Sequence, residues 1–210
     1  MGLFTRLPGY QNRHFYFFSL LFYHEVPLWS NTYFQEGKLM GITPTNIEHE
    51  VKAVDIVVSK GNDNGDITYA NPIFFKLAGY TQAELLEQPH SIIRHPDMPK
   101  IIFKYLWDTL KSGNDVKAFV KNLSKDGGFY WVYAHVRVAK NPDGSFRNYV
   151  STRKGMSSSA RTVIEPLYAQ LLEAEKIAGM DESVKVLEAF LQETGASLNT
   201  FNDAMQKIQG

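Results

Sequence analysis

The fold is decided by one stretch of the chain, residues 65–113, which reads GDITYANPIFFKLAGYTQAELLEQPHSIIRHPDMPKIIFKYLWDTLKSG. Its first part predicts a short strand over residues 67–70 and then a short helix that ends near Gly79. A second short helix follows, because Thr81 and Glu84 have the spacing of a capping box. The stretch therefore predicts one strand followed by several short helices.

A charged loop, Arg94-His95-Pro96-Asp97, separates these short helices from a longer one. Asp97 is the expected N-cap of the longer helix, Pro99 suits its first turn, and Gly113 suits the position after its end. A loop between helices rarely carries an arginine, a histidine and an aspartate so close together. The loop is therefore either a ligand contact or only the boundary between two helices.

Strand patterns flank this stretch on both sides. A strand over residues 54–59 and the turn-rich sequence GNDNGD precede it, which predicts a hairpin with residues 67–70. Two strands joined by Lys125-Asp126-Gly127-Gly128 follow within residues 117–139, and a last strand covers residues 145–154. The predicted fold class is α+β: a five-stranded antiparallel sheet with short helices on one side.

The strand after the glycine turn has a clear alternation of side chains. One face is predicted to hold Tyr130, Val132, Ala134, Val136 and Val138. The other face is predicted to hold Trp131, Tyr133, His135 and Arg137.

Three parts of the chain differ in pattern. Residues 1–39 are rich in aromatic side chains without a regular period; either translation begins at Met40, or this extension is a docking arm. Residues 40–155 form the predicted domain. Residues 156–210 form a helical segment with apolar stripes at helical spacing, which packs either onto the sheet or onto a second copy of the chain.

Composition excludes several classes of function. Lys plus Arg and Asp plus Glu both total 22, which gives no sign of nucleic-acid binding. The absence of cysteine excludes disulfides, thiolate metal sites and cysteine nucleophiles. The longest apolar run, residues 14–23, is far below the roughly 20 residues of a membrane span. We expect a cytoplasmic protein without a membrane span, the alternative being a secretory signal in that run.

Residues 50–155 closely resemble the sensory PAS domain of bacterial aerotaxis receptors. The resemblance is carried by the combination of ITYAN, GY, EL, PH, RHPDMP, LW and YWV. It implies a PAS fold that binds FAD non-covalently and reports redox, oxygen or energy state to chemotaxis proteins. Because the chain resembles the short, soluble members of this kind, the implied partner is a methyl-accepting or other membrane signalling protein in trans. A homodimer is also expected, and no enzymatic activity.

The charged loop suits the anionic end of FAD. Arg94 can bind the pyrophosphate through its guanidinium fork, and His95 can donate to a phosphate or ribose oxygen. The helix that begins after Asp97 can add its dipole. The alternative is purely structural, with Arg94 capping a helix or pairing with Asp97 or Glu84.

Three further residues suit the flavin ring. Trp107 can line the ring, and Asn71 and Asn122 lie where strand-end amides of this family face the pocket. The predicted cofactor-binding set is therefore Asn71, Arg94, His95, Asp97, Trp107 and Asn122.

Departures from the family pattern keep other interpretations open. Val116, Ala118 and Leu123 stand where the family tends to have tryptophan, glycine and arginine. A haem b gas sensor is one alternative, with His90, His95 or His135 as the axial ligand. A ligand-free dimerisation or interaction module is another. Cysteine-adduct photochemistry is excluded, and no nucleophile, metal cluster or phosphate loop supports catalysis.

Overall fold

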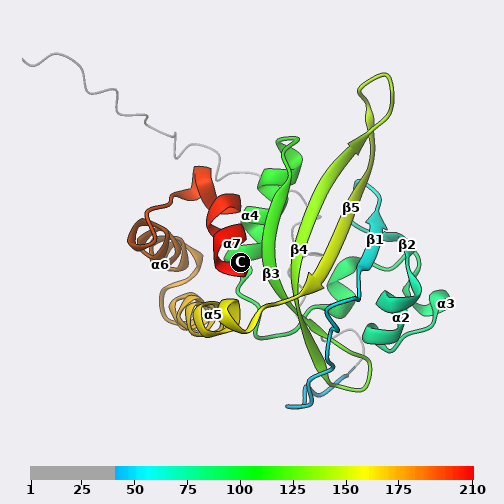
Figure 1. Cartoon of the computed structure of the whole chain (residues 1–210), viewed down its shortest axis with the longest axis horizontal. Coiled ribbons are helices and arrows are strands. Elements are labelled where there is room, and N and C mark those ends of the chain that lie inside the picture. The colour runs from blue at the N-terminus through cyan, green and yellow to red at the C-terminus, as the bar shows by residue number, and fades with distance from the viewer. Residues whose placement is uncertain (1–40) are drawn as a thin grey trace, which may run out of the picture.

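One antiparallel sheet of five strands organises the computed structural model, which describes residues 41–210 (Figure 1). The strands lie in the order β2-β1-β5-β4-β3, so the last strand in sequence is the central one. Their bounds are β1 Val57–Gly61, β2 Ile67–Ala70, β3 Val116–Leu123, β4 Phe129–Lys140 and β5 Phe146–Gly155. The predicted α+β class and five-stranded sheet are confirmed, although the first strand begins three residues later than Val54.

The glycine turn between β3 and β4 depends on backbone geometry that only glycine adopts readily. Gly127 has a φ of +88°, in the left-handed region. A Cβ atom there would also collide with the carbonyl oxygen of Thr43. The segment before β1 runs along this turn, where Thr45 N donates to Gly127 O at 2.8 Å and His49 N donates to Phe129 O at 2.7 Å.

Short helices cover one face of the sheet between β2 and β3. They are α2 Pro72–Ala78, α3 Gln82–Leu85, the 3₁₀ turn η1 His90–Ile93 and α4 Lys100–Lys111. Two predicted boundaries are confirmed: Gly79 ends α2 with a φ of +74°, and Thr81 and Glu84 form the capping box of α3. Gly113, with a φ of +84°, follows the end of α4 as expected.

The prediction that Asp97 is the N-cap of the long helix is wrong. The helix α4 begins at Lys100, and Pro99 occupies the N-cap position without a side-chain cap. Met98 precedes Pro99, and a residue before proline is disfavoured in the helical region. The helix therefore cannot begin as early as Asp97 requires.

The alternation predicted for β4 is confirmed by the layers on its two sides. Ala134 and Val136 line the cavity that lies under α4. Trp131 and Tyr133, on the other face, are 5% and 9% exposed, and Trp131 lies against Tyr168 of α5 at 5.8 Å between ring centroids. The sheet is thus buried on both faces near β3 and β4.

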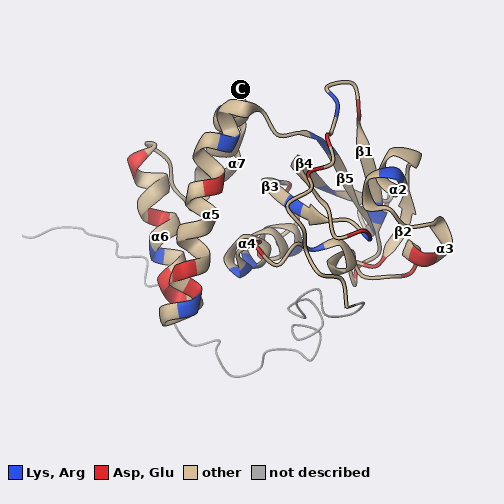
Figure 2. Ribbon diagram, turned by 90° about the horizontal axis from the view of Figure 1, so that it is seen from below, with Lys and Arg blue, Asp and Glu red and all other residues tan. Residues whose placement is uncertain are grey.

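The C-terminal helices stand at the β3 end of the sheet, and α2 and α3 lie at the other end (Figure 1, Figure 2). Their bounds are α5 Ser158–Ala178, α6 Met180–Glu193, the 3₁₀ turn η2 Leu198–Thr200 and α7 Phe201–Gln209. Their apolar stripes, which include Ile164 and Leu171, join the same buried cluster as the sheet. The stripes therefore pack onto the chain's own sheet.

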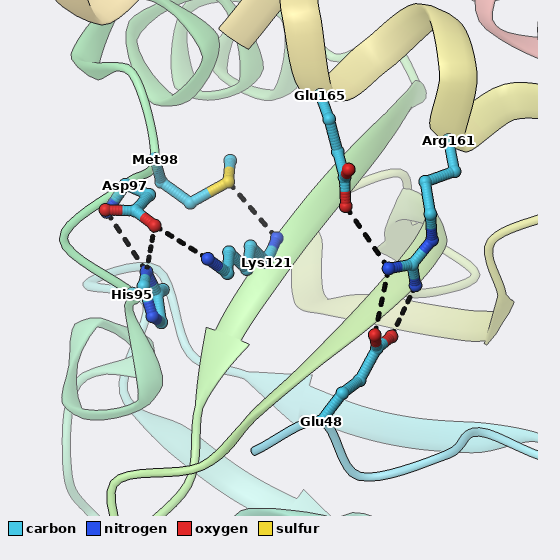
Figure 3. Close-up of polar contacts among 7 residues, drawn as sticks. All are labelled: Glu48, His95, Asp97, Met98, Lys121, Arg161 and Glu165. Carbon is cyan, nitrogen blue, oxygen red and sulfur yellow. Dashed lines mark hydrogen bonds and ion pairs between the residues drawn. The ribbon is translucent and has the colours of Figure 1, made fainter. Parts of the chain in front are cut away.

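These helices also satisfy the free edge of β3. The hydroxyl of Tyr168 donates to Phe119 O at 2.7 Å, and Asn202 Oδ1 accepts from Lys117 N at 2.7 Å. Near the start of α5, Arg161 pairs with Glu48 of the N-terminal segment and with Glu165 (Figure 3). These two backbone groups of the edge strand are therefore not available for pairing with another chain.

The extension predicted over residues 1–39 lies outside the described residues. Across residues 41–210, no helix combines the length and apolar character that a membrane crossing needs.

Candidate ligand cavity

A cavity of about 100 Å³ lies between the sheet and the elements η1 and α4. Its apolar wall includes Phe103 and Trp107 of α4 and Tyr149 of β5. The rings of Trp107 and Tyr149 meet edge to face, with their centroids 5.5 Å apart. The polar side chains that line the cavity belong to β1, β3 and β5 and to η1 and its C-cap, Arg94.

Arg94 enters the cavity from the end of η1. Its side chain is 6% exposed, and its guanidinium lies 4.1 Å from the ring centroid of Phe103. Its Nη2 donates to Met98 O at 3.3 Å. Stacking on an aromatic face holds the charged group in place beside the cavity.

Arg153 enters the same cavity from β5. It is 8% exposed, and its Nη1 donates to Ser59 Oγ at 3.0 Å. Burial lowers the pKa of Arg153 to about 10, which leaves the side chain protonated at neutral pH. Among residues 41–210 no ion pair joins Arg153 to a carboxylate. Within residues 41–210, the positive charge of Arg153 in the cavity therefore has no carboxylate partner.

A directed hydrogen-bond chain fixes the position of Arg153. The carbonyl oxygen of Gly65 can only accept, so His90 Nδ1 donates to it at 2.8 Å. His90 Nε2 then accepts from Ser59 Oγ at 2.9 Å, which leaves the Ser59 oxygen to accept from Arg153. Burial and the charge of Arg153 lower the pKa of His90 to about 4, in agreement with a neutral ring.

Polar atoms without partners face the same space. Asn122 Nδ2, Ser91 Oγ and Ser151 Oγ are buried and have no hydrogen-bond partner within the described part of the chain. Asn122 is only 4% exposed, and an isolated antiparallel bridge joins its backbone to that of Arg94. Buried polar groups in native proteins nearly always have partners, so these atoms indicate a place for a polar ligand or water.

Comparison with known proteins supports the architecture. Residues 67–153 match the family described as the PAS fold. The chain contains a PAS domain. The domain is 43% identical over 105 residues to the aerotaxis receptor of Escherichia coli (strain K12), which covers 50% of this chain and 21% of that protein. It is 29% identical over 109 residues to the nitrogen fixation regulatory protein of Klebsiella pneumoniae, covering 52% of this chain and 22% of that protein.

The chain thus spans about a fifth of the length of these two relatives. Among solved structures, the light state of the blue-light photoreceptor Aureochrome1 LOV aligns with a TM-score of 0.47 at 21% identity, covering 52% of this chain and 87% of that one. The PAS domain from the fruit-fly ELK potassium channel aligns with a TM-score of 0.44 at 21% identity, covering 47% and 85%. The predicted resemblance to the PAS domain of aerotaxis receptors is confirmed by the 43% identity.

The PAS domain brings together three of the six residues predicted from sequence. Arg94, Trp107 and Asn122 line the cavity. Asn71 does not: its Oδ1 accepts from Val58 N at 3.0 Å and Phe74 N at 3.2 Å, and its Nδ2 donates to Ile56 O at 2.7 Å. The expectation that Asn71 faces the pocket is therefore wrong, because its amide caps α2 and fixes the start of β1.

His95 and Asp97 also lie outside the cavity. The backbone at Arg94 is extended, and successive side chains on extended backbone point in opposite directions. His95 therefore faces away from the cavity, where its ring meets that of Phe129 at 5.8 Å between centroids. Burial, and then the charge of Lys121, lower the pKa of His95 to about 4, so the neutral ring accepts from Asp97 N at 3.1 Å.

Asp97 pairs with Lys121, whose side chain is mostly buried (Figure 3). The Nζ–Oδ2 distance is 2.6 Å, and the Asp97 side chain is 59% exposed. Burial alone would raise the pKa of Asp97, but the hydrogen bond and charge of Lys121 lower it overall. Asp97 therefore binds a lysine of β3 instead of a ligand in the cavity.

The N-terminus of α4, predicted to attract a phosphate, already holds a carboxylate. Glu175 of α5 accepts from Lys100 N at 3.0 Å and from Ile101 N at 2.9 Å. This contact lies on the His95 side of the loop, within a second cavity that Arg94, Pro96 and Lys176 also line. The helix dipole is therefore compensated from within the chain.

None of the three histidines considered for haem presents a nitrogen to the PAS cavity. Both ring nitrogens of His90 have partners, and His95 points away. His135 lies on the opposite face of β4, with its Nε2 3.3 Å from Asp115 Oδ2. Residues 41–210 also contain no group of three or more acidic, histidine or cysteine side chains placed to hold a metal ion.

The contribution of β5 to the cavity was not predicted from the sequence. Tyr149, Ser151 and Arg153 alternate with outward residues on this strand, and all three line the cavity. The period-two pattern of residues 145–154 could have shown that these side chains share a face. What the pattern could not show is that β5 is central in the sheet and lies directly beneath the ligand space.

Proposed function

We propose that this protein is a non-enzymatic sensor whose PAS domain binds FAD non-covalently in the cavity and reports redox or oxygen state. The partner is a methyl-accepting or other membrane signalling protein in trans, and the working state is a cytoplasmic homodimer. The proposal is supported by the 43% identity to a protein named as an aerotaxis receptor. The observation that carries it is the set of buried, unpartnered polar atoms beside two buried guanidinium groups.

The chemistry of the cavity suits a flavin nucleotide. FAD carries negative phosphates and a ring edge with both donors and acceptors. Arg94 and Arg153 supply buried cations, and Asn122 supplies an amide that can donate or accept. Phe103 and Trp107 supply flat apolar surface. Val116 and Ala118, which depart from the family pattern, are buried and keep the strand apolar.

The size of the cavity implies that α4 moves when a ligand binds. Small-molecule pockets are typically about 300–1,000 Å³, and this cavity is about 100 Å³. Trp107 and Phe103 are only half-buried, so they can swing outward at less cost than the fully buried residues of the sheet. A flavin is therefore accommodated by displacement of the α4 wall, which changes the position of α4 relative to α5.

The same contacts give a route for the signal. A bound flavin ring supplies reversible electron transfer, and its reduction changes the charge and the hydrogen-bonding groups that it presents. The side-chain amide of Asn122 can hydrogen-bond either form of the ring, by turning its carbonyl oxygen or its NH₂ group toward it. The backbone of Asn122 also forms an isolated β-bridge with Arg94. Arg94 stacks on α4, and Glu175 ties α4 to α5. A difference of a few kcal/mol between two arrangements is enough to switch such a unit.

The test is to purify the protein from flavin-replete cells, record its visible spectrum and identify any released flavin by chromatography. We expect flavin absorption and about one FAD per chain. Asn122→Leu should lose most of the bound flavin, whereas Asn64→Leu, in the exposed turn between β1 and β2, should retain it. A colourless wild-type protein with no extractable flavin would refute the proposal, and a haem spectrum would replace it with the gas-sensor alternative.

The small cavity also favours a second candidate, a ligand-free PAS interaction module. It predicts a colourless protein whose oligomeric state depends on concentration. Deleting the C-terminal helices is a poor test, because it would expose Phe119 and Trp131 of the sheet. Sedimentation of the full chain at several concentrations, with and without added FAD, separates the two candidates.

A further inference from the structure

Arg153 has an unusual environment for a buried charge. It is 8% exposed, lies on the cavity face of β5, and has Ser59 Oγ as its hydrogen-bond acceptor. Its guanidinium is 5.5 Å from the ring centroid of Phe74, which supplies no negative charge. An arginine has five N–H donors, and in the described residues only one of those of Arg153 has an acceptor.

An arginine kept only for the fold would be expected to have a carboxylate partner. Removing a charge from water costs several kcal/mol unless an opposite charge or several hydrogen bonds compensate. The carboxylate of Asp66, in the turn between β1 and β2, forms no ion pair with Arg153 and accepts from Asn62 at 3.0 Å. The uncompensated charge is therefore a cost to the ligand-free fold.

The surrounding groups aim Arg153 at the cavity. Ser59 gives its only hydrogen to His90, so its oxygen is committed to accepting from Arg153. Ser151, two residues earlier on the same strand face, has a buried hydroxyl without a partner. The cation and this hydroxyl thus face the same space, as they would around a negatively charged group of a ligand.

We propose that Arg153 binds the negatively charged group of the cavity ligand and that, for a flavin, it favours the reduced ring over the oxidised ring. This inference rests on the proposed function and adds a residue that sets the redox potential. Reduction by two electrons and one proton, taken from a reductant such as dithionite, adds one negative charge to the flavin. Arg153 keeps its own proton throughout, and its charge stabilises the added negative charge.

The experiment compares wild-type protein with Arg153→Met, Arg153→Lys and the control Arg137→Met. Arg137 lies on the same sheet but is exposed on β4, so its replacement removes the same charge outside the cavity. Three quantities are measured for each protein: flavin retained per chain, midpoint potential with excess FAD during a dithionite titration, and melting temperature of flavin-stripped protein.

We expect Arg153→Met to retain less than a tenth of the wild-type flavin. With excess FAD its midpoint potential should fall by at least about 30 mV, which is a tenfold loss of preference for the reduced form in a two-electron couple. Its stripped form should melt at the wild-type temperature or about 2–4 °C higher, because a costly buried charge is gone. Arg153→Lys should stay close to wild type in potential, and Arg137→Met should match wild type in all three quantities.

Several outcomes overturn the inference. If Arg153→Met keeps its flavin and potential while the wild type is yellow, the inference fails and the proposed function stands. If Arg153→Met does not fold, or its stripped form melts well below wild type, Arg153 is structural and the inference fails. A colourless wild type overturns the proposed function and this inference together.

Discussion

Glu175 of α5 caps α4 by accepting the backbone N–H of Ile101 at 2.9 Å, across 74 residues of sequence. Its other oxygen accepts from Lys100 N at 3.0 Å, and the hydroxyl of Ser183 in α6 donates at 3.3 Å to the oxygen that also accepts from Ile101. The positive end of the α4 dipole is therefore neutralised by the C-terminal helices. The helix that forms the cavity wall and the helices expected to carry the signal meet at this carboxylate.

Removing this carboxylate should destabilise the protein and loosen the start of α4. We expect Glu175→Ala to lower the free energy of unfolding by about 1–2 kcal/mol, the usual range for a lost helix cap with its charge. Urea unfolding measures the loss, and hydrogen exchange should accelerate at the amides of Lys100 and Ile101. The control is Glu173→Ala, an exposed residue of α5 that is 3.9 Å from Lys176, which should change stability by less than about 0.5 kcal/mol. Equal losses in the two variants would show that the cap contributes nothing specific.

The hydroxyl of Tyr168 should contribute to the stability of the folded protein. The group is buried and donates to Phe119 O at 2.7 Å on the free edge of β3. Tyr168→Phe keeps the ring against Trp131 but leaves a buried carbonyl oxygen without its donor, which costs about 1–3 kcal/mol. Tyr69→Phe is the matched control, because Tyr69 is 46% exposed, and it should have little effect in the same thermal or urea measurement. A Tyr168→Phe variant as stable as the control would mean that water replaces the hydroxyl at the β3 edge.

Local signals predicted most of the fold because their physics is local. The capping box of Thr81 and Glu84 and the left-handed glycines Gly79 and Gly127 depend only on neighbouring residues. The start of α4 was predicted wrongly although the signal against Asp97 is local, since Met98 precedes Pro99 and is disfavoured in the helical region. The carboxylate that does cap α4, Glu175, could not be predicted because it comes from a distant part of the chain. The partner of the C-terminal stripes was left open for the same reason, since periodicity shows that a face is buried but not against what.

The candidate site was predicted only in part, for similar reasons. Arg94, Trp107 and Asn122 were placed correctly beside the cavity, whereas adjacent His95 points the other way on extended backbone. Asn71 was misassigned because the amide of a helix N-cap is consumed by the backbone. Arg153 was not predicted because it belongs to no motif, and its place in the cavity depends on the central position of β5 in the sheet.

The charged loop should divide into a half that binds the ligand and a half that does not. Arg94→Met is expected to lower flavin retention at least tenfold, because it removes a buried guanidinium of the cavity. Asp97→Asn is expected to retain flavin and to lose less than about 1 kcal/mol of stability, because the Asp97 side chain is 59% exposed and asparagine keeps an oxygen that can accept from Lys121. Flavin content per chain after gel filtration, together with urea unfolding, checks both expectations. Loss of flavin in Asp97→Asn alone would place the ligand on the His95 side of the loop, contrary to the proposed cavity.

His90 should make the protein less stable as the pH falls through weakly acidic values. An unfolded histidine has a pKa near 6.5, whereas burial lowers the pKa of His90 in the folded protein to about 4. Between these values the unfolded chain binds more protons than the folded one, so stability is complete above about pH 6.5 and falls toward pH 4. The expected loss from His90 at pH 5 is about 2 kcal/mol.

His95, with its pKa also lowered to about 4, should contribute in the same direction. His90→Gln should therefore remove roughly half of the change in unfolding free energy between pH 7 and pH 5, whatever its stability at pH 7. Urea unfolding at both values measures this difference, and most carboxylates protonate only at lower pH. An unchanged difference in His90→Gln would mean that His90 accepts its proton without breaking the bonds to Ser59 and Gly65.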